Sequence, residues 1–265
     1  MIVSRRGNNK RSIERRMARG MTGLPRVGTL PYLNSEPFFA CLEGVEQVSM
    51  IPRALGAVML RGELDAGLLS LADALALGDA VDLLPFGIAT PGATGSVHVW
   101  SHRPLEALHG ATIGVTGETS TSRSILRMLL EQRYGVKDVR WTALHTDADA
   151  VLLIGDEALR QRGRPSRFAC CTDLGMEWVA WTGLPAVFAS WVIRRKLPEA
   201  TRATLTAAID TALTRGLATL DTIAARRRDT GISEAEVIDY LRNFIYRFGP
   251  AENRAIAEFT RRASA

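Results

Sequence analysis

Short β-type runs alternate with helical segments from residue 26 to residue 193, and this alternation limits the possible folds more than any other feature of the sequence. Residues 26–33, 66–70, 112–115 and 150–154 are four of these runs. Strands that alternate with helices build βαβ units, in which neighbouring strands are parallel. The sequence therefore predicts an α/β fold with a largely parallel sheet.

Two changes in this pattern predict two lobes rather than one continuous sheet. The phrase HRPLEALHGATIGV follows the run at 96–101 and begins a fresh buried strand, as the start of a second sheet would. The long run at 186–193 then returns just before a helical tail that begins at Pro198. Two crossing segments between α/β lobes define a hinge with a cleft, and ligands bind beyond the carboxyl ends of the strands at such a cleft.

The predicted division of the chain has three parts. Residues 1–24 form a basic, disordered extension, residues 25–95 with 192–265 form the first lobe, and residues 96–191 form the second lobe. Charge sets the extension apart, because residues 1–20 hold seven Lys and Arg but only one Glu. Blocks of like charge repel one another and stay solvated.

Charge and composition exclude several classes of partner. The chain has 33 basic and 28 acidic side chains, and 26 basic and 27 acidic ones remain when the first 20 residues are set aside. A near-neutral body argues against nucleic acid as a partner. No run of about 18 apolar residues is present to span a membrane, and the basic leader lacks the apolar stretch of roughly 7 to 15 residues of an export signal. With an odd number of cysteines, three, we expect a reduced, cytoplasmic protein.

The familiar catalytic and cofactor motifs are absent from the sequence. It contains no GxGxxG, GxxxxGK[ST], GxSxG or HExxH pattern. The four histidines are not at metal-ligand spacing, and the adjacent Cys170 and Cys171 cannot chelate as a CxxC pair does. We therefore predict neither a metal nor a cofactor, and we interpret His98 and His102, near the expected hinge, as packing or surface residues.

Hydroxyl and amide side chains stand at the ends of several predicted strands. They are Asn34 in GTLPYLNSEP, Ser70, Ser96 and the TSTS run of Thr119, Ser120, Thr121 and Ser122. If the two lobes close on each other, all of these side chains face one cleft. The TSTS run leads into a helix, where it could bind a carboxylate or phosphate or simply cap the helix, and the pattern leaves both open.

Longer segments of the chain resemble the chorismate dehydratase family of the futalosine route to menaquinone. The matching segments, in order, are VGTLPYLNSEPF, GELDAGLLSLADAL, GSVHVWS, TSTSRSILRMLLEQRYG, ADAVLLIGDEAL, DLGMEWVAWTGLPAVFASWVIR and YLRNFIYRFG. The resemblance implies a two-lobed fold like that of type 2 periplasmic binding proteins, with a central cleft and C-terminal helices. It also implies a hydro-lyase that converts chorismate to 3-[(1-carboxyvinyl)oxy]benzoate without a metal or cofactor.

The resemblance also implies roles for the polar strand ends. Asn34 and Ser96 are the expected catalytic residues, and an Asx turn before Pro37 is the competing explanation of Asn34. The expected substrate-binding residues are Leu33, Ser70, Gly95, Thr119, Ser120, Thr121, Ser122 and Gly155.

Two other groups in the matching segments have structural interpretations. Asp156 and Glu157 would repel a dianionic substrate, so we interpret them as helix-start residues, with Gly155 allowing close approach of the backbone. Three tryptophans are interpreted as packing anchors rather than as residues that stack on a substrate ring. They are Trp178, Trp181 and Trp191.

The chain departs from the family at the loop before the TSTS helix. GETSTS stands where relatives carry a loop resembling DTSSRTS, and Arg123 is displaced to the start of the helix. Two alternatives to chorismate dehydration therefore stay open. One is a divergent lyase for a chorismate-like compound, and the other is a cytoplasmic binding protein for an aromatic carboxylate. A homodimer is compatible with the sequence.

Overall fold

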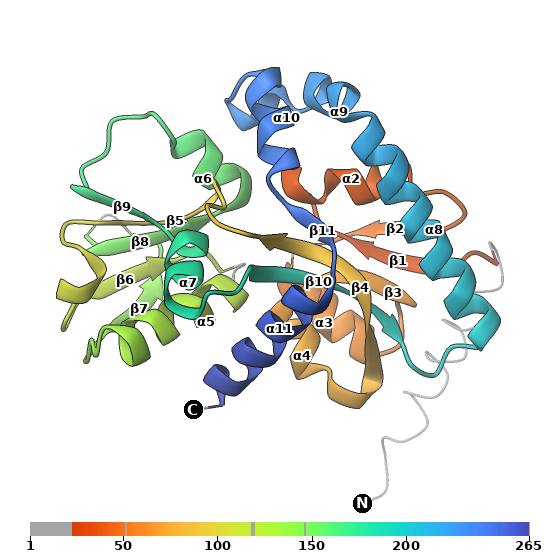
Figure 1. The fold of residues 1–265 in the computed structure, drawn as a ribbon, viewed down its shortest axis with the longest axis horizontal. Helices are drawn as coiled ribbons and strands as arrows, with labels where there is room; N and C mark the ends of the chain where they lie inside the picture. Colours follow the sequence, from red (N-terminus) through yellow and green to blue (C-terminus); the bar gives the residue numbers. More distant parts are fainter. Residues whose placement is uncertain (1–22, 51, 118–119, 146, 265) are drawn as a thin grey trace, which may run out of the picture.

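The chain forms two lobes side by side, each built around its own sheet, as Figure 1 shows. The computed structural model describes residues 23–50, 52–117, 120–145 and 147–264. The basic extension expected over residues 1–24 therefore lies outside the described residues, except for its last two positions.

The larger lobe contains a mixed sheet of six strands. Their spatial order is β11 (Ile245–Arg247), β4 (Val81–Thr90), β10 (Ala186–Arg194), β3 (Ala66–Ser70), β1 (Arg26–Thr29) and β2 (Glu46–Ser49). β1 is parallel to β2 and β3, whereas β10 is antiparallel to β3 and β4, and β11 is antiparallel to β4. The first eight residues of β10 are all buried, which is the pattern of a strand covered on both faces.

The smaller lobe contains a sheet of five strands. Their spatial order is β7 (Arg140–Ala143), β6 (Thr112–Val115), β8 (Ala150–Ile154), β5 (Val97–Ser101) and β9 (Cys170–Asp173). β6 is parallel to β7 and β8, and β5 is antiparallel to β8 and β9. Three parallel strands therefore end at the same edge of this sheet.

Helices cover both sheets. In the larger lobe they are α2 (Glu36–Phe39), α3 (Pro52–Leu60), α4 (Leu71–Ala76), α8 (Glu199–Ala218), α9 (Leu220–Arg226) and α10 (Glu234–Arg242), and in the smaller lobe α5 (Ser120–Met128), α6 (Gly155–Gln161) and α7 (Leu174–Thr182). Short 3-10 turns are η1 (Leu33–Ser35), η2 (Gly78–Ala80), η3 (Leu105–Ala107) and η5 (Arg228–Thr230), and η4 (Leu129–Arg133) is a π-helical turn. α10 begins at a capping box, in which Ser233 and Glu236 bond each other's backbone N–H groups.

α8 approaches α2 closely because it carries a glycine at the contact. A Cβ atom at Gly216 would come within 2.0 Å of the carbonyl oxygen of Pro37. Any larger residue would force the two helices apart. The position of the long helix over the larger lobe, visible in Figure 1, thus depends on this glycine.

The chain passes between the lobes twice, after β4 and before β10. Pairing of β10 with β4 begins at Ala186, opposite Thr90, and the whole strand lies in the larger sheet. The boundary expected between residues 191 and 192 therefore falls inside β10. The crossing is made by the loop before the strand, because the strand's ladder of hydrogen bonds commits it to one sheet from its first residue.

The last helix, α11 (Pro250–Ala263), contacts the smaller lobe although it follows β11 of the larger one. The Phe259 and Trp178 rings lie 6.2 Å apart, and the Arg262 guanidinium lies 3.6 Å from the Trp181 ring centroid. Figure 1 shows α11 below the junction of the two lobes. The C-terminal segment expected in the first lobe thus also packs against the second.

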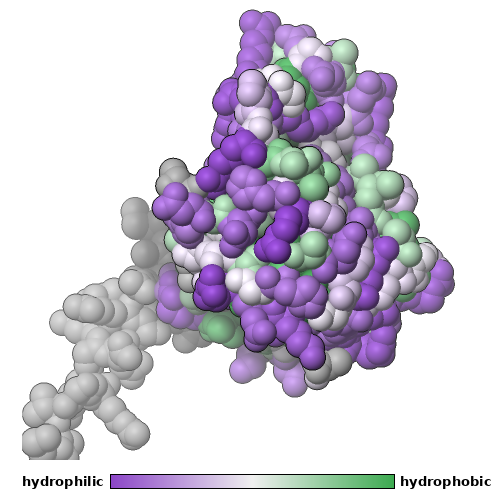
Figure 2. Space-filling model, turned by 90° about the vertical axis from the view of Figure 1, so that its left-hand side faces the viewer, coloured by the Kyte–Doolittle hydropathy of each residue, from purple (hydrophilic) through white to green (hydrophobic). Residues whose placement is uncertain are grey.

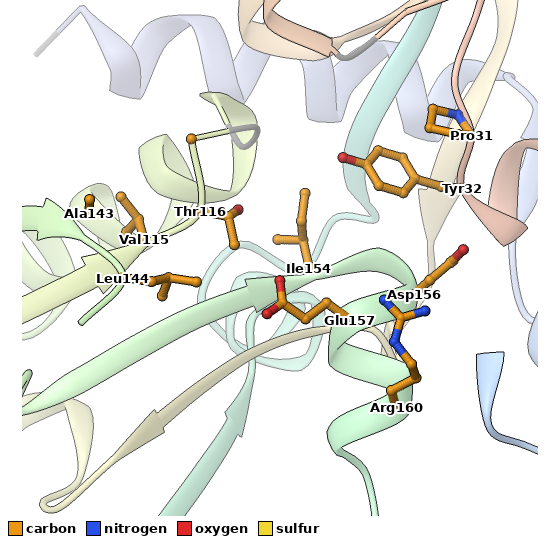
Figure 3. Close-up of a pocket in the computed structure, with 11 residues that line it drawn as sticks. Pro31, Tyr32, Val115, Thr116, Ala143, Leu144, Ile154, Asp156, Glu157 and Arg160 are labelled. Carbon is orange, nitrogen blue, oxygen red and sulfur yellow. The ribbon is translucent and has the colours of Figure 1, made fainter. Parts of the chain in front are cut away.

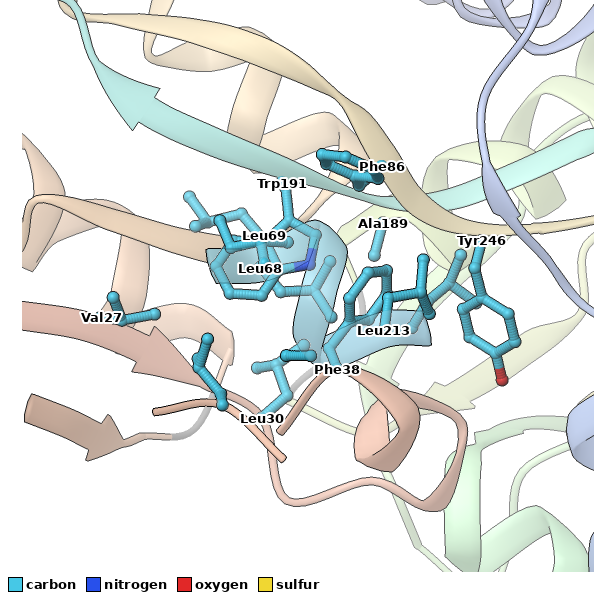
Figure 4. Packing of buried hydrophobic residues seen from close by; sticks show 14 of the residues in the cluster. Val27, Leu30, Phe38, Leu68, Leu69, Phe86, Ala189, Trp191, Leu213 and Tyr246 are labelled. Atoms are coloured by element: carbon cyan, nitrogen blue, oxygen red, sulfur yellow. The ribbon is translucent and has the colours of Figure 1, made fainter. Parts of the chain in front are cut away.

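Aliphatic and aromatic side chains together fill the core of the larger lobe (Figure 4). Phe38 lies edge-on to Trp191 at 5.6 Å and edge-on to Tyr246 at 5.5 Å. Trp191 is 0% exposed and Trp178, in the smaller lobe, is 1% exposed. The interpretation of these two tryptophans as packing residues is confirmed, and Trp181 is half-buried beneath Arg262.

The surface at the smaller-lobe end is mainly hydrophilic, with small hydrophobic patches between the polar residues (Figure 2). In the described part of the chain, no helix is both long enough and apolar enough to cross a membrane. The apolar residues are instead gathered in two buried clusters, one in each lobe for the most part.

Candidate active site

The carboxyl ends of β6 and β8 form a crevice at one edge of the smaller sheet. β6 lies between β7 and β8 and is parallel to both. The chain leaves β6 through α5 toward β7, but it leaves β8 through α6 toward β9 on the opposite side. Because the two connections diverge, a gap remains between the strand ends, and open α/β sheets bind ligands at this position.

A cavity of about 420 Å³ lies at this crevice (Figure 3). Its walls are formed by Pro31, Tyr32, Val115, Thr116, Gly117, Ala143, Leu144, Ile154, Asp156, Glu157 and Arg160. The first two residues follow β1 of the larger lobe and the others belong to the smaller lobe. The cavity is thus part of the cleft between the lobes, and its volume suits a small organic ligand.

Gly155 lets the two lobes meet at the cavity wall. A Cβ atom at this position would lie 2.9 Å from Cδ1 of Tyr32, and the backbone φ angle of +57° also favours glycine. The tyrosine ring of the larger lobe therefore lies directly on the backbone at the start of α6. The expectation that Gly155 allows a close approach is confirmed.

Asp156 joins the lobes through both of its oxygens. Oδ1 accepts a hydrogen bond from the backbone N–H of Leu33 at 3.0 Å, and Oδ2 pairs with the guanidinium of Arg227. Arg227 also donates to Glu36 at 2.8 Å. Burial lowers the pKa of Arg227, but its hydrogen bond to Asp229 and the surrounding carboxylates outweigh that effect and raise it above its usual value. The negative charge of Asp156 is therefore balanced at the edge of the cavity.

Glu157 and Arg160 bring opposite charges to the cavity wall from α6. Asp156 and Glu157 both occupy the first turn of this helix, as expected, but both also line the cavity, which their interpretation as purely structural residues did not predict. Nη1 of Arg160 lies 3.4 Å from the carbonyl oxygen of Asp229. Among the described residues, no three His, Cys, Asp or Glu side chains are grouped closely enough to hold a metal ion.

Ser96 lies behind the cavity wall and is completely buried. Its hydroxyl is 2.7 Å from that of Tyr240, and its carbonyl oxygen accepts from the N–H of Gly155 at 2.8 Å. Burial raises the pKa of Tyr240, so the phenol keeps its proton at neutral pH. Gly95, with a φ angle of +70°, precedes Ser96 and lies beside the Tyr240 ring.

Asp173 fixes the segment through which the chain enters the smaller lobe. Its carboxylate accepts from the N–H groups of Thr94 and Gly95 and from the Thr94 hydroxyl, at 2.8 to 3.0 Å. Nε2 of His98 lies 3.2 Å away. Burial would raise the pKa of Asp173, but the hydrogen bonds from His98, Thr94 and Gly95 hold it below the ordinary value of 3.8. His98 is buried and packs against Trp100.

The hydroxyls of the TSTS run take part in a second contact between the lobes. Ser70 and Ser120 each donate to Oδ2 of Asp73, at 2.8 and 2.9 Å. The N–H of Ala72 donates to Oγ1 of Thr121 at 3.0 Å. The start of α5 is thus bonded to the start of α4 across the cleft, and Ser70 also caps α4.

The remaining members of the run are less informative. Ser122 is 5% exposed, within the first turn of α5. Thr119 lies outside the described residues.

Asn34 lies half-buried in η1, two residues after the cavity residue Tyr32. The side-chain hydrogen bonds of this turn come from the next residue, because Oγ of Ser35 donates to the carbonyl oxygens of Leu30 and Tyr32 at 2.9 and 2.6 Å. Ser35 therefore performs the turn-stabilising role that was considered for Asn34.

The wall of the cavity is not made of the expected site residues. Of those that the structure describes, none belongs to its wall. Their neighbours do, however: Tyr32 precedes Leu33, Gly117 comes shortly before the TSTS run, and Ile154 and Asp156 flank Gly155. Their roles in catalysis and binding stay predictions.

Several residues of the site were not predicted from the sequence. Tyr32 and Tyr240 stand inside the matching segments YLN and YLRNF, so the segments pointed to them without naming a role. Thr116 comes one residue after a predicted strand, which is a usable signal. No local pattern in the sequence predicts that Arg227 belongs to the site, because its partner Asp156 is 71 positions away.

Comparisons with known proteins agree with this architecture. The crystal structure of a protein from Archaeoglobus fulgidus has a TM-score of 0.75 at 17% identity, over 92% of this chain and 98% of that one. The periplasmic aliphatic sulphonate binding protein of Escherichia coli has a TM-score of 0.61 at 16% identity, over 91% of this chain and 85% of that one. The predicted α/β fold of the two-lobed, periplasmic-binding-protein type is confirmed.

Sequence comparison is more specific than the fold. The chorismate dehydratase of Thermus thermophilus is 31% identical over 258 residues, which cover 89% of this chain and 92% of that protein. A family model described as menaquinone biosynthesis matches residues 25–265. The match includes both lobes, both crossings and every wall of the cavity, and the chain belongs to this menaquinone biosynthesis family.

Proposed function

We propose that this protein is a chorismate dehydratase, a hydro-lyase that converts chorismate to 3-[(1-carboxyvinyl)oxy]benzoate. The family match and the identity with the Thermus enzyme support the proposal. The structural observation that carries it is the cavity of about 420 Å³ between the lobes, which has room for a six-membered ring with two carboxylate-bearing groups. The futalosine route and a cytoplasmic location belong to the same proposal and rest on the resemblance of segments such as DLGMEWVAWTGLP.

The reaction breaks bonds on two neighbouring ring carbons. The carbon that bears the enolpyruvyl ether loses its proton, and its neighbour loses the hydroxyl group, so that an aromatic ring and one water molecule result. As the proton leaves, negative charge develops on the ring carboxylate through the diene. Hydrogen-bond donors at that carboxylate therefore stabilise the transition state. The substrate's own enolpyruvyl carboxylate is close enough to the proton to serve as the base.

In this proposal Asn34 donates to the reacting carboxylate and Ser96 hydrogen-bonds the departing hydroxyl. Ser96 lies behind the contact between Tyr32 and Gly155, so the substrate reaches it when the lobes separate at that contact. Polar and backbone groups of eight further residues hold the substrate. They are those of Leu33, Ser70, Gly95, Thr119, Ser120, Thr121, Ser122 and Gly155.

The charges at the cavity constrain how a dianion would lie. Asp156 is paired with Arg227 and repels an anion less than a bare carboxylate would. Arg160 supplies a cation on the same wall as Glu157. We therefore orient the substrate with a carboxylate toward Arg160 and away from Glu157.

Incubation of the purified protein with chorismate tests the proposal. We expect a product that is lighter than chorismate by one water and has the ultraviolet absorbance of a substituted benzoate. A preparation purified in the same way from cells that lack this protein serves as the control for contaminating activity. Binding of chorismate without product would favour a binding protein for an aromatic carboxylate instead, and the absence of both would reject chorismate as the ligand.

A further inference from the structure

We propose that Thr116 is a substrate-binding residue, whose hydroxyl donates a hydrogen bond to an acceptor oxygen of the bound substrate. The inference rests on the proposed function for the identity of that substrate, a dicarboxylate of the chorismate type. It adds a residue to the site, because the carboxylate loop expected from the resemblance begins only at Thr119.

The Thr116 hydroxyl lacks a hydrogen-bond partner among the described residues. Its Oγ1 atom is buried and has no hydrogen bond to any other described residue. A threonine hydroxyl can donate one hydrogen bond and accept two. Buried polar groups nearly always find partners, because an unsatisfied one destabilises the folded chain. A bound ligand can supply the missing partner where such a group faces a cavity.

Thr116 does face a cavity. It comes directly after Val115, the last residue of β6, and it lines the space between the diverging ends of β6 and β8. Figure 3 shows Thr116 on the smaller-lobe side of this space, with Tyr32 of the larger lobe across it and Ile154 between them. Thr116 therefore lies where a sheet of this type holds its ligand.

Other threonine hydroxyls near the cleft serve the fold. Oγ1 of Thr121 accepts from the N–H of Ala72 at 3.0 Å, and Oγ1 of Thr94 donates to Asp173 at 2.8 Å. Loss of either hydroxyl would leave a protein group unpaired. Loss of the Thr116 hydroxyl would leave no described group unpaired, so its removal separates a ligand role from a structural one.

Tyr246 provides a matched control. Its hydroxyl is likewise buried without a partner among the described residues. Its ring, however, lies in the core of the larger lobe, 5.5 Å from Phe38 and 6.2 Å from Phe244, and it does not line the cavity. Thr116→Val and Tyr246→Phe each delete an unsatisfied hydroxyl and nearly preserve shape, so neither should lower the melting temperature.

The experiment compares wild type with Thr116→Val, Thr116→Ser and Tyr246→Phe. Chorismate turnover is measured for each, together with the melting temperature with and without chorismate. We expect Thr116→Val to raise KM about tenfold or more, as loss of a hydrogen bond to a charged acceptor does, while its melting temperature without chorismate equals or exceeds that of wild type. Thr116→Ser keeps the hydroxyl and should resemble wild type, as should Tyr246→Phe.

Two results would overturn the inference and leave the proposed function standing. One is Thr116→Val with unchanged kcat and KM, and the other is Thr116→Val with a lower melting temperature in the absence of chorismate. Failure of the proposed function looks different, because wild type would form no product. In that case, a chorismate-dependent rise in melting temperature for wild type but not for Thr116→Val would still support the binding role. No rise for wild type would reject it.

Discussion

Asn34 lies in the turn η1, five residues after β1 ends at Thr29, rather than at the end of a strand over 26–33 as expected. Ser35 makes the side-chain hydrogen bonds that hold this turn, which leaves the Asn34 amide for the proposed chemistry. Asn34→Asp keeps the volume but adds a negative charge beside a dianionic substrate and removes a donor. One oxyanion donor contributes about 2.7 to 4 kcal/mol of transition-state stabilisation. We therefore expect a decrease in kcat/KM that corresponds to at least this free energy. Asn34→Ala removes the donor without adding charge and should be milder.

Turnover of chorismate and thermal melting of the two Asn34 variants decide between roles. The catalytic role gives the activity order wild type, Ala, Asp, with little change in melting temperature. If Asn34 served a turn instead, Asp would be tolerated and Ala would lower the melting temperature. A fully active Asn34→Asp variant would contradict the catalytic role of Asn34. The catalytic role would then be assigned to Ser96 and the TSTS run.

Asp173 makes the stability of the entry segment depend on pH. Its folded pKa lies below the ordinary value of 3.8 because hydrogen bonds from His98, Thr94 and Gly95 outweigh the effect of burial. A lowered folded pKa stabilises the folded state above the unfolded pKa, and this contribution is lost as the pH falls below about 4 through the folded pKa. We expect Asp173→Asn to lower the free energy of unfolding at pH 7 by about 1 to 3 kcal/mol.

Denaturant unfolding of wild type and Asp173→Asn at pH 7 and pH 3 checks this. The difference in unfolding free energy between the two proteins should narrow at pH 3, because the Asp173 carboxyl of unfolded wild type binds a proton below about pH 4 and the stabilising contribution begins to be lost there. An equal gap at both pH values would mean that the charge of Asp173 does not carry its effect.

At the scale of elements, Arg227 clamps α6 of the smaller lobe to α2 of the larger one. It bridges Asp156 and Glu36, and its side chain is 13% exposed. Arg227→Met leaves both carboxylates without this cation. Removing one partner of a buried ion pair costs about 3 to 5 kcal/mol, and partial exposure reduces that, so we expect a loss of about 2 kcal/mol in the free energy of unfolding.

Urea unfolding measures this loss, and a second substitution supplies the control. Adding Asp156→Asn to Arg227→Met removes one of the two uncompensated charges and leaves that of Glu36, so the double variant should recover part of the lost stability. If Arg227→Met were as stable as wild type, the clamp would contribute nothing to the association of the lobes.

At the scale of the whole molecule, the first described strand and the family match begin at nearly the same position. The first strand starts at Arg26, and the family match starts at residue 25. Residues 1–20 carry seven basic side chains and no apolar stripe that could face a core. We expect deletion of residues 1–20 to leave the melting temperature and chorismate turnover nearly unchanged, and loss of folding in the shortened protein would show that the extension is structural.

The sequence by itself determined the elements and the type of fold. Hydrophobic periodicity and capping residues act within a few positions of the chain, so the strands at 66–70, 112–115 and 150–154 and the capping box at Ser233 were predictable. The change of pattern near residue 96 likewise predicted a second sheet, and the β5 strand of that sheet begins at Val97.

Only the tertiary structure decided which side chains meet. The pairing of β10 with β3 and β4 places this strand wholly in the larger sheet, and the sequence of β10 does not specify these partners. Likewise, α11 contacts the smaller lobe through aromatic rings, and no local sequence pattern predicts this contact. Asp156 meets Arg227 and Leu33, and Ser96 meets Tyr240, across separations of 71, 123 and 144 positions. Propensity and periodicity act over a few residues, whereas these contacts depend on how two lobes close, and the walls of the cavity are set by that closure.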